Sequence, residues 1–222
     1  MSSTIKRHPD AVTLMTYAAG GLAEPLAAVV AAHAAMCPGC RAELADLELL
    51  GAALLLSGEG ASGEAALGEG PIEVPARPQD GHTTSMARRR KIAGDRLPHP
   101  IAAAYGLTFE RIAWKRLGPG ILHHRLALSQ GVEGDLRLLK ISPGRMMPEH
   151  GHGGAELTLV LDGAYSDESG DYRCGDIQDV DEVVEHRPVA DAIAGCICLI
   201  ASERPARFKG FMGRLLQPLT GM

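Results

Sequence analysis

The sequence predicts a chain of two domains: a small helical domain over residues 1–56 and an all-β domain of the sandwich or barrel class over residues 105–222. Apolar residues recur at helical spacing in the first range, whereas short apolar stretches bounded by turn residues recur in the second. Aromatic residues divide the chain in the same way, because Tyr17 is the only one before Tyr105. A chain of 222 residues has room for two small domains.

Three short helices are predicted in the first domain. The first covers residues 10–19 and is closed by Gly20 and Gly21, a pair typical of a helix end. The apolar stripe of the second and third helices consists of Leu26, Val29, Val30, Leu44, Leu47, Leu50, Leu54 and Leu55. Helices of this length bury little apolar surface, so we expect a metal ion to stabilise them and metal binding to be coupled to folding.

A metal-binding motif lies between the second and third helices. His33, Cys37 and Cys40 follow the helical spacing i, i+4, i+7, so they fall on one narrow face. Pro38 ends one helix near Cys37 and begins another, which places Cys40 in a first turn, facing back to His33. A structural zinc site needs four ligands, and His8 is the first candidate upstream; the alternative is a loose terminal histidine. A redox dithiol is less favoured, because no strand precedes the two cysteines.

The segment over residues 57–104 is predicted to be a flexible linker, because glycine and proline are frequent in it. It contains a basic run, Arg88–Lys91, which we interpret as a solvated stretch. Strands are then predicted over residues 111–117, 121–128, 136–141, 157–165, 192–201 and 207–215.

A second metal-binding pattern begins at Gly144. His150 and His152 lie on one face of a predicted strand, and Glu156 can return to that face because side chains alternate along a strand. Two imidazoles and a carboxylate suit zinc, iron, manganese, nickel or copper, so ligand type does not select the metal.

This run, from Gly144 to Gly163, resembles the first motif of the cupin superfamily in every spacing. The resemblance implies a cupin β-barrel of the jelly-roll type, with a further histidine ligand on a later strand that pairs with the strand of His150. Gly175 and His186 keep the spacing of the second cupin motif, although Asp181, Val183 and Ala190 depart from its usual residues. His186 is therefore the implied fourth ligand; the alternative is an ordinary surface histidine.

With both motifs in this order, the chain resembles the ChrR-type zinc anti-sigma factors. The resemblance implies that His8, His33, Cys37 and Cys40 bind zinc, and that His150, His152, Glu156 and His186 bind the cupin metal. It further implies an extracytoplasmic-function-type sigma factor as partner, released on a stress signal such as reactive oxygen or singlet oxygen. Family members place a fourth helix at about residues 57–90, where glycine is frequent here. Cys196 and Cys198 share a strand face and are sensing candidates, although buried structural cysteines are the commoner case.

Composition excludes several other classes. A net charge of −5 and a pI near 6.0 disfavour direct binding to nucleic acid. The first residues lack the apolar core of a signal peptide, and no apolar run could span a bilayer, so we expect a cytoplasmic protein. Five cysteines in a reducing compartment do not indicate a disulfide framework.

Two alternatives remain open at this point. The cupin domain could be a metal-dependent enzyme, such as a dioxygenase or isomerase, docked through the zinc domain. The zinc domain could instead bind a partner other than a sigma factor. Whether the chain dimerises through its cupin is not readable from the sequence.

Overall fold

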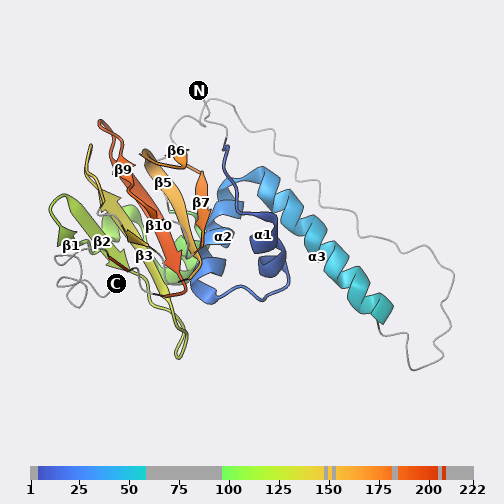
Figure 1. Cartoon of the computed structure of the whole chain (residues 1–222). Coiled ribbons are helices and arrows are strands. Elements are labelled where there is room, and N and C mark those ends of the chain that lie inside the picture. The colour runs from blue at the N-terminus through green and yellow to red at the C-terminus, as the bar shows by residue number, and fades with distance from the viewer. Residues whose placement is uncertain are drawn as a thin grey trace, which may run out of the picture.

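The computed structural model describes residues 5–58, 97–147, 150–151, 154–181, 185–204 and 207–208. It contains a helical N-terminal region followed by a cupin-like domain of antiparallel strands (Figure 1). The helix α2 lies beside the sheet, α1 lies next to α2 on the side away from the sheet, and α3 extends away from both. Within the described residues, no helix combines the length and the apolar character that a membrane span requires.

Three helices occur in the N-terminal region, as predicted. α1 (Ala11–Ala18) begins after Asp10, whose carboxylate accepts a hydrogen bond from the backbone N–H of Thr13 at 2.6 Å. α2 (Glu24–Met36) has Pro25 in its first turn, where a missing N–H is tolerated. α3 (Pro38–Gly58) follows after a single extended residue, Cys37. The predicted break at Pro38 is therefore confirmed.

The apolar stripe predicted on α3 is buried only over its first part. Leu44 is buried in the core, but Leu50, Leu54 and Leu55 are exposed. Only the first part of α3 lies against the other helices, and the rest projects into solvent (Figure 1). Helical periodicity identifies an apolar surface, but it does not tell whether that surface is covered by the same chain or by a partner.

The strands form two sheets in the described part of the chain. The eight-stranded sheet has the order β1-β2-β3-β10-β5-β6, with β7 and β9 also paired to β5, and the three-stranded sheet has the order β11-β4-β8. The bounds in chain order are β1 (Lys115–Gly118), β2 (Ile121–Arg125), β3 (Asp135–Ile141), β4 (His150–Gly151), β5 (Glu156–Asp167), β6 (Gly170–Arg173), β7 (Ile177–Val180), β8 (Glu185–His186), β9 (Val189–Ala190), β10 (Cys196–Ser202) and β11 (Arg207–Phe208).

The long strands agree with the sequence predictions, while several short elements were missed. β2, β3, β5 and β10 overlap the predicted ranges. The range 111–117 starts too early, because a 3₁₀ turn at Phe109–Arg111 precedes β1. A helix, α4 (His99–Tyr105), and the strands β6, β7 and β9 were not predicted, whereas β4 and β8 are the strands expected to carry His150 and His186. Elements of two to four residues are too short for a period to be recognised. The ranges 59–96 and 209–222 lie outside the described residues.

The helical region and the sheet share one hydrophobic core. Leu26, Val29 and Val30 of α2 belong to the same buried cluster as Leu157 and Leu199 of the sheet. The opposite face of the sheet carries a second cluster that includes Val160, Tyr165, Tyr172, Cys196 and Cys198. The helical region is thus packed on one sheet face rather than joined to it only by a linker.

Candidate zinc centre and second metal site

The structure brings together the four residues expected to bind zinc. One ligand atom from each of His8, His33, Cys37 and Cys40 lies within 4.8 Å of the others. His8 Nδ1 is 3.5 Å from Cys37 Sγ and 3.3 Å from Cys40 Sγ, and His33 Nε2 is 3.3 Å from Cys40 Sγ. A tetrahedral zinc ion with ordinary bond lengths separates its nitrogen and sulfur ligands by about 3.3–3.8 Å. These three separations lie in that range, so the donor set and its spacing are compatible with a zinc ion.

The helix junction explains this geometry. His33 lies in the last turn of α2, and its carbonyl oxygen accepts a 2.7 Å hydrogen bond from the N–H of Cys37. The extended backbone at Cys37 reverses the chain into α3, so that Cys40 in the first turn returns to the His33 ring. His8 approaches from the segment before α1 and is the exposed member of an otherwise buried set.

Burial changes the pKa values of two of the expected ligands, His33 and Cys40. It lowers the pKa of His33 to about 4, with a further decrease from neighbouring His8, while the backbone of Gly175 and the Asp176 carboxylate oppose the change. The imidazole is thus neutral at ordinary pH, the form that coordinates metal. Burial and the neighbouring Cys37 raise the pKa of the Cys40 thiol to about 12. Metal binding must therefore displace its proton.

The residues expected to bind the second metal are only partly described. β4 and β8 pair antiparallel with His150 opposite His186, as the cupin resemblance implies for their strands. Glu156 begins β5 and is buried, and His186 is also buried. His152 lies outside the described residues, so convergence of the four side chains on one ion stays a prediction.

A carboxylate that the sequence analysis missed orients His186. Asp167 Oδ2 lies 2.8 Å from His186 Nδ1. The same carboxylate accepts hydrogen bonds from the Gln178 amide at 2.8 Å and the Ser169 hydroxyl at 2.5 Å. Although burial opposes it, these hydrogen bonds and the one from His186 lower the pKa of Asp167. A carboxylate on one ring nitrogen is the usual support for a histidine that binds metal through the other, here Nε2.

The remaining cysteines have the character of core residues. Cys196 and Cys198 are both buried, with their sulfur atoms 3.4 Å apart. The contact with Cys198, together with burial, raises the pKa of Cys196. Burial likewise raises the pKa of Cys174 to about 11. Thiols with raised pKa values are poor nucleophiles, because the thiolate is the reactive form.

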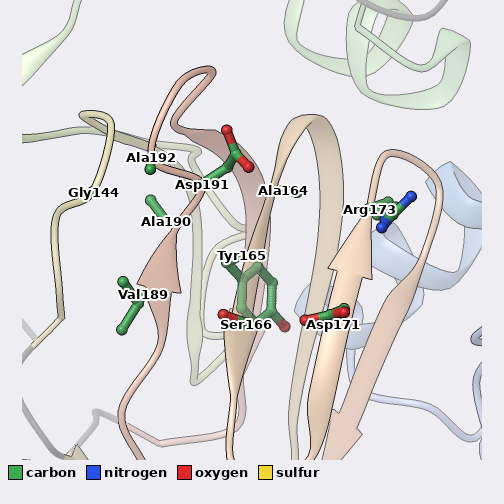
Figure 2. Close-up of a pocket in the computed structure, with 10 residues that line it drawn as sticks. All are labelled: Gly144, Ala164, Tyr165, Ser166, Asp171, Arg173, Val189, Ala190, Asp191 and Ala192. Atoms are coloured by element: carbon green, nitrogen blue, oxygen red, sulfur yellow. The ribbon is translucent and has the colours of Figure 1, made fainter.

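A hollow of about 440 Å³ opens on the sheet near β5, β6 and β9. Figure 2 shows Asp171 and Arg173 on one side and Asp191 on the other, with Tyr165 between them. Neither His186 nor Glu156 lines it. The hollow is therefore separate from the expected metal site.

Fold and site together define a two-part protein in which a zinc-binding helical region precedes a cupin-like domain. Residues 103–205 match the ChrR cupin-like domain family, and residues 13–41 match a family of zinc fingers. The second match contains His33, Cys37 and Cys40. It begins at residue 13, so it does not include His8.

The chain is 39% identical over 215 residues to the anti-sigma-E factor ChrR of Cereibacter sphaeroides, covering 97% of this chain and 98% of that protein. It belongs to the ChrR family of anti-sigma factors. The crystal structure of Rhodobacter sphaeroides SigE in complex with the anti-sigma ChrR matches with a TM-score of 0.69 at 38% identity, covering 90% of this chain and all of the matched chain. The family resemblance drawn from the sequence is confirmed.

Proposed function

We propose that this chain is an anti-sigma factor that sequesters an extracytoplasmic-function-type sigma factor through its zinc-binding helices and releases it on a stress signal. The supporting observation is the near full-length similarity to ChrR combined with an intact zinc ligand set. A sigma factor held in this way cannot reach core RNA polymerase, so the bound state represses transcription.

We assign the sigma-binding surface to the C-terminal half of α3. Five leucines there are 57–75% exposed: Leu49, Leu50, Leu54, Leu55 and Leu56. At about 100° per residue they point in all directions around the helix axis. A helix that is apolar on every side is normally buried. This one projects from the molecule, and no described part of the chain covers its leucines, so we take a partner to be their cover (Figure 1).

Zinc sets the direction of this surface. The ion would join the end of α2 to the first turn of α3 through His33, Cys37 and Cys40. Because α2 is packed on the sheet, a fixed junction also fixes the angle at which α3 leaves the molecule. Loss of zinc frees that angle, and the leucine surface is no longer presented in one orientation.

The cupin-like domain is the proposed sensory part. His150, His152, Glu156 and His186 would bind a divalent metal, zinc or else manganese, iron or nickel, inside a sheet closed into a barrel. Modification of a ligand, or of Cys196 and Cys198, by reactive oxygen such as singlet oxygen is the proposed signal. The signal releases sigma only if it changes the relative free energies of the bound and free states. We place the protein in the cytoplasm, where its partner acts, and homodimerisation through the cupin belongs to the same proposal.

Affinity purification of the tagged full-length chain from unstressed cells tests the function. A sigma factor at near-equal stoichiometry is expected, and it should be absent with Cys37→Ala but present with Cys174→Ala as a matched cysteine control. Recovery of the wild-type chain with bound metals and no sigma factor would contradict the proposal. Steady turnover of a small-molecule substrate by that same preparation would then favour the enzyme alternative.

A further inference from the structure

We propose that the cupin-like domain positions the fourth zinc ligand, His8, so that the zinc centre belongs to both parts of the molecule. The N-terminal strap, residues 5–10, carries His8 and lies along the turn between β6 and β7. Asp176 and Arg7 are the positioning residues. The inference goes beyond sigma binding and requires only that the four ligands hold zinc.

The backbone on both sides of His8 is bonded to the sheet. Asp176 Oδ1 accepts hydrogen bonds from the N–H groups of Lys6 at 2.7 Å and Arg7 at 3.1 Å. The carbonyl oxygen of Arg7 accepts a bond from the N–H of Ile177 at 3.2 Å. After His8, the N–H of Asp10 donates to Asp179 at 3.1 Å. These bonds fix the strap before α1 begins.

Asp176 is well placed to hold the strap against the sheet. It is buried, and its second carboxylate oxygen accepts a 2.9 Å hydrogen bond from the N–H of Arg173. One carboxylate therefore joins the β6–β7 turn to the strap. A buried carboxylate that accepts several backbone N–H bonds is held firmly in one orientation.

Side chains of the strap add further contacts with the β6–β7 region of the sheet. The Arg7 guanidinium donates to the carbonyl oxygens of Asp171 and Ser169, both at 3.1 Å. It also lies 4.4 Å from the centre of the Tyr172 ring, within cation–π range. Ile5 packs so closely on Gly175 that a Cβ there would lie 2.6 Å from Ile5 Cγ1.

His8 is the ligand most dependent on such support. The other three are buried and lie on α2, α3 or the junction between them, whereas His8 is exposed. Its ring meets His33 edge to face at 5.6 Å between centroids. Without the strap contacts, His8 keeps the contact with the His33 ring and the sulfur contacts of the site itself, and water can compete for its place on the metal.

The strap is also connected to the second metal site. Arg7 Nη1 is 3.4 Å from the Tyr172 hydroxyl, which lies 2.8 Å from Ser169 Oγ. Ser169 bonds Asp167, which in turn holds His186. Hydrogen bonds thus lead from His186 to the residue next to His8.

Zinc affinity of the N-terminal site tests the proposal; it is measured by competition with a chromogenic chelator in the full-length protein whose second site is removed by His150→Ala and Glu156→Ala. Asp176→Ala is expected to lower zinc affinity about 10–100-fold, the usual effect of removing a residue that supports a metal ligand. Asp171→Ala is the matched control, because the Asp171 side chain is exposed and its backbone carbonyl remains available to Arg7. The control should bind zinc as the wild type does.

A double-mutant cycle separates positioning from general damage. In a His8→Ala background, Asp176→Ala should cause a much smaller loss than in the wild type, because only the electrostatic effect of Asp176 on His33 then remains. An equal loss in both backgrounds, or none in either, would overturn the proposal. If Asp176→Ala does not fold, Arg7→Ala replaces it, with exposed Lys6→Ala as control. With cobalt in place of zinc, the visible spectrum of Arg7→Ala should shift toward that of His8→Ala, and an unchanged spectrum would also refute the role of the strap.

Discussion

Replacing Leu50 and Leu54 of α3 by alanine should weaken sigma binding without harming the fold. The two side chains are four residues apart and therefore lie on one side of the helix. They are 57% and 62% exposed in the free protein, so somewhat more than half of each remains for a partner to cover. Full burial of a leucine contributes about 1.5–3 kcal/mol, which leaves about 1–2 kcal/mol for each residue at the interface.

The pair is therefore worth about 2–4 kcal/mol, or about a 30- to 700-fold increase in Kd for the sigma factor. Stability should change little, because both side chains are exposed and alanine favours helix. The measurement is a binding titration with labelled sigma factor, accompanied by zinc content and thermal unfolding of the free variant.

Leu44→Ala is the contrasting control. Leu44 is buried in the shared core, so its truncation should cost about 2–5 kcal/mol of stability. Substitution of Leu50 and Leu54 should thus affect sigma binding, whereas substitution of Leu44 should affect the stability of the fold. A double variant with wild-type stability and a Kd within threefold of wild type would refute the assignment of this surface to sigma.

Three further predictions concern the metal sites. Cys40→Ala should abolish zinc binding at the helix junction and co-purification of sigma while the sheet keeps its far-ultraviolet circular dichroism; a zinc content equal to that of the wild type would contradict the ligand assignment. Gly175→Ala should destabilise the chain by about 1–3 kcal/mol and lower zinc affinity, because the residue has φ +93° and a Cβ would strike Ile5. Gly106 also has a positive φ but has open space around it, so Gly106→Ala should lower stability and leave zinc affinity unchanged. Equal zinc affinities for the two variants would show that the Ile5 contact is irrelevant. Asp167→Asn should weaken metal binding at the second site about 10–100-fold in a direct titration, whereas unchanged affinity would show that Asp167 does not support a ligand.

The zinc centre could be read from the sequence to the extent that its ligands are close along the chain. His33, Cys37 and Cys40 share a face by helical arithmetic, and Pro38 marks the break that makes them converge. His8 carries no such signal, because an irregular segment separates it from the others. It was a candidate because a structural zinc site needs a fourth ligand, and the family resemblance then implied it; its Nδ1 lies 3.3 Å from Cys40 Sγ.

Contacts between distant segments could not be read at all. Asp176 bonds residues about 170 positions earlier, and nothing in either segment indicates the other. Asp167 beside His186 likewise depends on how β5 and β8 are arranged. The exposure of α3 was missed for a different reason: an apolar period is the same whether the covering surface belongs to this chain or to another.

The position of the zinc centre suggests how a signal in the cupin-like domain changes sigma affinity. α2 is fixed to the sheet, α3 carries the proposed binding surface, and the residues expected to bind zinc lie at the junction between them. A signal need not separate the two parts, which would require breaking their shared core. It needs only to act on the strap, because displacement of His8 alters the junction from which α3 extends. Such a change shifts the equilibrium between bound and free sigma factor. The shift is limited to the difference between the free energies of sigma binding to the two junction geometries. The strap variants should therefore weaken zinc and sigma binding in the same rank order.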